Sequence, residues 1–262
     1  PEGRAAEAQR MLADPRARRQ IGTFAAQWLG VEAVETLVKA PEQYPRFDAA
    51  LARDFLAETQ AFAAAVVFDG AGTFRELVTA DWTVASPRLA AHYALAAPDA
   101  DGRVALSRGR RAGVLGHASV LATQAHSDQS SPIRRGLFVR GHLLCQPLPP
   151  APANAGGVPD VDPQATTRER FRQHTDDPFC AGCHQYIDEL GFGFEHFDAV
   201  GAWRDTENGA PIDARSNLND LEGLGVGTDA PYHSLPELGA LLADSQAAPR
   251  CFVSQLWQFA LG

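Results

Sequence analysis

The chain has 262 residues, 45% of them hydrophobic, and a formal net charge of −9 at pH 7. This apolar content is enough for a sizeable core, while no apolar run is long enough to cross a bilayer. The acidic excess lies in residues 136–262, which hold 17 of the 32 Asp and Glu residues but only seven of the 23 Lys and Arg residues. An acidic C-terminal half argues against nucleic-acid binding, because phosphates would be repelled, and it suits a basic redox partner.

Helical patterns dominate the first 144 residues. Asp14 is an N-cap followed by proline at the first helical position, and Gly30 ends this helix. A second amphipathic helix is expected over residues 47–68. Shorter helices are expected over residues 73–80, 86–96, 110–123 and 131–144, with a loop or small hairpin over 99–109. Gly113 and Gly116 favour close packing against another helix or a flat cofactor.

The second half of the chain is more irregular. Residues 147–163 contain six prolines and two adjacent glycines, so we expect an extended connector there. Thr166 and Glu169 form a capping-box pattern that begins a helix. A helix is expected to open at Cys180 and to continue through Leu190, followed by loops or short strands over residues 191–212. Helices return over residues 234–243 and 249–261.

The run Cys180-Ala181-Gly182-Cys183-His184 is typical of covalent haem attachment. Two thiols spaced by one helical turn add to the two vinyl groups of the macrocycle. The imidazole of His184 is then directed at the iron, for which it is a good axial ligand. The sequence therefore predicts one haem c, with Cys180 and Cys183 as anchors and His184 as the proximal ligand.

Two other interpretations use the same residues. A redox-active dithiol would normally lie in a βαβ pattern, which the sequence lacks. A zinc site would combine Cys180, Cys183, His184 and His174. Its ligand pairs are closer together than is usual, and adjacent Cys183 and His184 suit tetrahedral coordination poorly.

Aromatic residues after the motif are candidates for the walls of a haem crevice. They are Phe192, Phe194, Phe197 and Trp203. Arg204 is a candidate partner for a haem propionate, because a guanidinium matches a carboxylate. Ordinary core packing and a surface arginine are the alternatives.

The sixth iron ligand is left open among several candidates. His126 lies in a polar turn and is our first choice, followed by Met11, the sole methionine, and then by His174. His174 precedes Cys180 by only six residues. An open sixth position would change the function from electron carrier to reactive centre.

The two remaining cysteines, Cys145 and Cys251, lie in apolar helical contexts. In an oxidising compartment they can pair and close a loop of roughly a hundred residues. Two separate buried thiols are the alternative. Because haem c is attached outside the cytoplasm, the haem prediction favours the disulfide.

The chain resembles the haem-c-containing DUF1592/DUF1588/DUF1585 proteins of environmental bacteria. The matching motifs are Ser131-Pro132-Ile133-Arg134-Arg135-Gly136, Leu143-Leu144-Cys145, Thr167-Arg168-Glu169-Arg170, Cys180-Ala181-Gly182-Cys183-His184, Ile187-Asp188, Gly191-Phe192-Gly193-Phe194-Glu195 and Phe197-Asp198-Ala199-Val200-Gly201. The resemblance implies a periplasmic or secreted haem protein, usually part of a larger polypeptide, and supplies no activity. Asp188-Glu189 replaces the common Asp-Pro and affects the turn that follows the motif.

These observations predict a mainly α-helical protein with a Pro-rich connector and a small cytochrome c-like haem region. Residues 1–130 would be a DUF1592-like helical domain, 131–215 the DUF1588-like haem-binding region and 216–262 a truncated DUF1585-like helical region. The expected function is single-electron transfer through one covalent haem to a redox partner or to upstream domains. The alternatives are a haem enzyme with an open distal site and a zinc-binding or structural module.

Overall fold

A computed structural model describes residues 2–150, 164–176, 178–223 and 229–262. Most of these residues are helical, as predicted. The helices are α1 (Glu2–Leu12), α2 (Pro15–Trp28), η1 (Glu32–Thr36), α3 (Ala49–Asp69), α4 (Phe74–Thr79), α5 (Pro87–His92), η2 (Gly113–Gly116), α6 (Ala118–Thr123), α7 (Pro132–Phe138), η3 (Val139–Leu143), α8 (Thr167–Asp176), α9 (Pro178–His184), α10 (Asp188–Phe192), α11 (Leu235–Asp244) and α12 (Ala247–Leu261).

Six short strands accompany the helices in the described residues. They are β1 (Trp82–Val84), β2 (Arg103–Ala105), β3 (Thr206–Glu207), β4 (Ala210–Pro211), β5 (Ser216–Asn217) and β6 (Pro231–Tyr232). They form three two-stranded antiparallel pairs, β1–β2, β3–β4 and β5–β6. The segment 99–109, expected to be a loop or a small hairpin, contains only β2, whose partner β1 comes from the segment between α4 and α5.

Local capping explains where several helices begin. The side chain of Asp14 accepts a hydrogen bond from the backbone N–H of Arg16 at the start of α2. Thr166 and Glu169 form the predicted capping box: the Thr166 N–H donates to Oε2 of Glu169 at 2.7 Å, and the Glu169 N–H donates to Oγ1 of Thr166 at 3.3 Å. The predicted connector falls mainly on residues 151–163, which lie outside the described residues.

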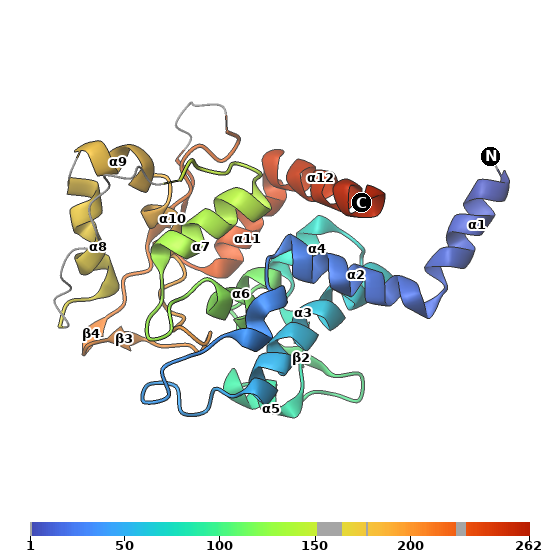
Figure 1. The fold of residues 1–262 in the computed structure, drawn as a ribbon, viewed down its shortest axis with the longest axis horizontal. Coiled ribbons are helices and arrows are strands. Elements are labelled where there is room, and N and C mark those ends of the chain that lie inside the picture. The colour runs from blue at the N-terminus through green and yellow to red at the C-terminus, as the bar shows by residue number, and fades with distance from the viewer. Residues whose placement is uncertain (1, 151–163, 177, 224–228) are drawn as a thin grey trace.

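One large hydrophobic core joins elements that are far apart in the sequence. It contains Phe24 of α2, Leu121 of α6, Phe138 of α7 and Leu242 of α11, together with Phe194, which follows α10. In Figure 1, α1 projects from one end of the molecule, while α8 and α9 lie on the opposite flank. Side chains from all three predicted regions therefore fill a shared core.

A buried polar cluster lies within the N-terminal helices. The carboxyl group of Glu58 accepts hydrogen bonds from the hydroxyls of Tyr93 at 2.5 Å and Thr83 at 2.9 Å. The guanidinium of Arg111 lies 3.8 Å from the centre of the Tyr93 ring. Burial raises the pKa of Glu58 to about 7 and lowers the pKa of His117 to about 3. The cluster therefore favours a neutral His117 and an unusually basic carboxylate.

Cys145 and Cys251 form the predicted disulfide, which links residues 106 positions apart. It ties α12 to the end of the α7–η3 helix. On the same part of α12, the Phe252 ring packs against Trp28 and Phe74 at centroid distances of 4.9 and 5.5 Å. None of the described helices has the length and apolar character needed to span a membrane.

Candidate functional site

The Cys-x-x-Cys-His motif occupies the end of α9, a short helix that follows α8. The sequence predicted a helix opening at Cys180 and running to Leu190, but α9 ends at His184 and a separate helix, α10, begins at Asp188. Backbone bonds from Tyr186 N–H to the Cys183 carbonyl and from Ile187 N–H to the His184 carbonyl tighten the chain into a turn here. The turn brings the first residue of α10 back beside the histidine.

The imidazole of His184 is held by a buried carboxylate. Its Nδ1 lies 3.0 Å from Oδ1 and 3.1 Å from Oδ2 of Asp188. The side chain of Asp188 is 0% exposed, whereas that of His184 is 23% exposed. The hydrogen bond to Asp188 raises the pKa of His184. A metal bound by this imidazole would have to use its other ring nitrogen, Nε2.

Close backbone packing fixes the position of Asp188. A Cβ atom added to Gly136 in α7 would lie 2.1 Å from the Ile187 carbonyl oxygen, and one added to Gly191 in α10 would lie 1.9 Å from the Pro132 carbonyl oxygen. Only glycine permits this approach of α10 to α7. The backbone on either side of Asp188 therefore packs directly against α7, which holds the carboxylate in position.

The phenylalanines predicted to wall a haem crevice lie in the protein interior. Phe192, Phe194 and Phe197 are 3%, 0% and 1% exposed. Phe194 and Phe197 belong to the large core, and the guanidinium of Arg168 covers the Phe192 ring at 4.2 Å. These positions match the alternative of ordinary packing, and contact with a haem stays a prediction.

Trp203 and Arg204 lie together in a second cluster. The Trp203 ring stacks on His196 with centroids 4.4 Å apart. The guanidinium of Arg204 donates to Oε2 of Glu195 at 2.9 Å and to Oε1 of Glu207 at 3.3 Å. Because these carboxylates already bind Arg204, a propionate would have to compete with them, and the predicted propionate contact also stays a prediction.

Comparison with protein families assigns most of the chain. Residues 111–207 match the model of PSCyt3, a protein of unknown function (DUF1588), and residues 1–95 match that of PSD4, a protein of unknown function (DUF1592). The chain therefore contains a DUF1592 region followed by a DUF1588 region. No curated protein and no solved structure matches it. The DUF1585-like character expected for residues 216–262 stays a prediction.

A buried arginine organises the DUF1588 region. The Arg135 side chain is 1% exposed, and its Nη1 donates to the carbonyl oxygens of Phe194 at 2.9 Å and Phe197 at 2.7 Å. Burial lowers the pKa of Arg135 to about 10. Nη1 also lies 3.5 Å from Oε1 of Glu195, which links Arg135 through Glu195 to Arg204. In the sequence, Arg135 and Glu195 stand out only as members of family motifs, and no local signal predicts their pairing.

The donor set of the DUF1588 region fits the proximal side of a covalent haem. Nδ1 of the His184 ring is already bound by Asp188, as is usual for a metal-binding histidine, and the preceding Cys183 is exposed with a free thiol. The side chains of Cys180 and His174 lie outside the described residues. Among the described residues, no three His, Cys, Asp or Glu side chains converge as a metal site. The strand pairs in the described part of the chain are all antiparallel, whereas a βαβ unit joins parallel strands.

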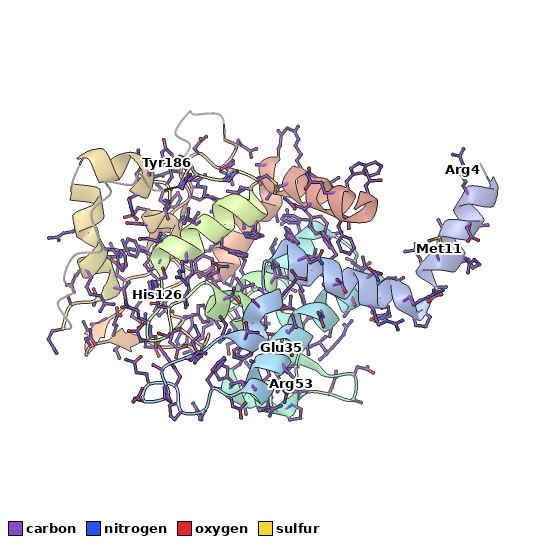
Figure 2. All side chains as sticks on the ribbon, viewed as in Figure 1. Arg4, Met11, Glu35, Arg53, His126 and Tyr186 are labelled. Carbon is purple, nitrogen blue, oxygen red and sulfur yellow. A yellow bond between two sulfur atoms is a disulfide. The ribbon has the colours of Figure 1, made fainter. Side chains whose placement is uncertain are left out.

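Two of the three candidates for a sixth ligand, Met11 and His126, can be placed in the structure, whereas the side chain of His174 lies outside the described residues. Figure 2 places Met11 on the projecting α1 and His126 well away from Tyr186, the labelled residue two positions after His184. Met11 is 58% exposed. His126 is partly buried, which lowers its pKa, and its backbone carbonyl accepts a hydrogen bond from the Lys39 ammonium at 2.8 Å. Neither residue lies beside Tyr186 in Figure 2, and the identity of the sixth ligand stays a prediction.

Proposed function

We propose that this chain is a c-type cytochrome module that carries one covalent haem c and transfers single electrons. The observation that carries the proposal is the arrangement at the end of α9. There His184 follows a cysteine pair of haem-attachment spacing, and Asp188 binds its Nδ1 at 3.0 Å. A histidine that binds a metal almost always donates its other ring N–H to such a partner.

Each residue of the motif has a defined role. The thiols of Cys180 and Cys183 would form the two thioether bonds, and Nε2 of His184 would bind the iron. The bound haem supplies a one-electron redox couple. Asp188 holds the imidazole in one orientation and one tautomer, with the proton on Nδ1. The packing of α10 against α7 keeps that carboxylate in place.

The remaining features support a location in the periplasm or outside the cell. Disulfides such as Cys145–Cys251 persist in oxidising compartments, where haem c is also attached. The acidic residues 136–262, which contain the motif, suit a partner with a basic surface, and such complementarity accelerates association. Upstream domains of a longer polypeptide are the other candidate partner.

A haem enzyme with an open distal site is the second candidate. Met11 and His126 do not lie beside Tyr186 in Figure 2, and this separation favours an unfilled sixth position. Peroxidase-like turnover of a small oxidant would then be expected.

Absorption spectra of the matured protein test the proposal and separate it from the second candidate. A carrier gives a six-coordinate, low-spin spectrum that ignores carbon monoxide and cyanide, together with a reversible one-electron titration. Rapid binding of carbon monoxide, with turnover of peroxide, would contradict the carrier and support the enzyme. A chain that takes up no haem would refute both.

A further inference from the structure

The carboxylate of Asp188 lies against the ring of His184. Both of its oxygens lie within 3.1 Å of Nδ1, and its side chain is 0% exposed. A carboxylate in this position makes the imidazole a stronger electron donor and places a negative charge close to whatever binds Nε2. Because the Asp188 carboxylate itself is buried, the effect of its charge on the imidazole is only weakly screened.

We propose that Asp188 is a positioning residue that lowers the reduction potential of the iron bound to His184. The inference rests on the proposed function. Negative charge and a more basic ligand both favour the ferric over the ferrous state, because the ferric ion carries the greater positive charge. The module would consequently accept electrons only from a donor of low potential and pass them to a broad range of acceptors.

The neighbouring Glu189 provides a matched control. Its side chain is 40% exposed, and its Oε1 lies 3.6 Å from Nη1 of Arg168. Glu189→Gln and Asp188→Asn therefore remove the same charge from adjacent positions of α10. Only Asp188→Asn alters the contact with His184, and it retains an oxygen that can still accept the Nδ1 proton. A purely structural role for Asp188 would be preserved in this variant.

The test is the midpoint potential of the haem-loaded protein and of both variants, measured by spectroelectrochemistry. Asp188→Asn is expected to raise the ratio of reduced to oxidised iron at fixed applied potential about tenfold, which corresponds to about 59 mV for one electron. Glu189→Gln is expected to change that ratio less than about threefold. Equal shifts in the two variants would overturn the inference.

A second measurement on the unaltered protein covers the case in which Asp188→Asn does not fold. The Nδ1 proton of His184, observed by NMR in the haem-loaded state, is expected to exchange slowly with deuterated water because it is bound by a buried carboxylate. Rapid exchange would overturn the inference. Haem content reports separately on the proposed function: a parent chain without haem refutes that function and this inference together, while a loaded chain with an unaffected potential refutes the inference alone.

Discussion

The disulfide between Cys145 and Cys251 should supply a large part of the stability of the fold. It closes a loop of 106 residues. For a loop of that length, the entropy removed from the unfolded chain corresponds to about 5 kcal/mol at 25 °C, and measured losses for native disulfides are typically about 2–5 kcal/mol. We expect the double variant Cys145→Ser/Cys251→Ser to lose free energy of unfolding within this range.

The assay is guanidinium denaturation of the parent and the double variant, each with and without a thiol reductant. Reductant should lower the parent to the stability of the variant and should leave the variant unchanged, because thioether bonds to haem are not reduced. A loss below about 1 kcal/mol would refute the reasoning. It would show that the aromatic packing of α12 alone restrains this part of the chain.

Three further substitutions test the packing and electrostatics by the same denaturation assay. Phe252→Ala removes a ring whose centroid lies 4.9 Å from that of Trp28, and it should lower the free energy of unfolding by about 2–4 kcal/mol. The adjacent Val253, whose side chain is 62% exposed, is the control, and Val253→Ala should change stability by less than about 0.5 kcal/mol. Equal effects of the two substitutions would contradict the packing of α12. Burial raises the pKa of Glu58 in the folded protein to about 7, against 4.5 ordinarily, so the protonated carboxyl stabilises the fold at low pH. The free energy of unfolding of the parent should therefore fall by about 3 kcal/mol as pH rises from 4.5 to 7, and Glu58→Gln should lack that fall. Identical pH profiles of parent and variant would contradict the raised pKa. Gly136→Ala, whose Cβ would meet the Ile187 oxygen, should cost about 1–3 kcal/mol, while Gly141→Ala, with nothing within 4 Å, should cost none; a stable Gly136→Ala would refute the close contact of α7 and α10.

The sequence predicted those parts of the fold that depend on local signals. The N-cap at Asp14 and the capping box at Thr166 act within one helical turn, so they can be read directly from neighbouring residues. The disulfide was favoured from the sequence because the expected attachment of haem c would place the chain in an oxidising compartment, where Cys145 and Cys251 can pair.

Long-range pairings were not predictable in this way. Strand β1 has three residues and is defined by its partner β2, about twenty positions later. The burial of Arg135 depends on carbonyl groups some 60 positions away, and a lone arginine in a helix is normally expected at the surface. The end of α9 at His184 arises from a turn that allows α10 to pack on α7. His184 and Asp188 are only four positions apart, so their proximity could be predicted from their spacing, but the burial of the Asp188 carboxylate required the structure.

A pyridine haemochrome spectrum of the chain, matured in a host that attaches haem c, decides whether Cys180 and Cys183 bind haem. We expect one haem per chain with the absorption band of two thioether bonds, and a shifted band in Cys183→Ser, which retains one. A chain that contains zinc and gives no haemochrome band would contradict this expectation.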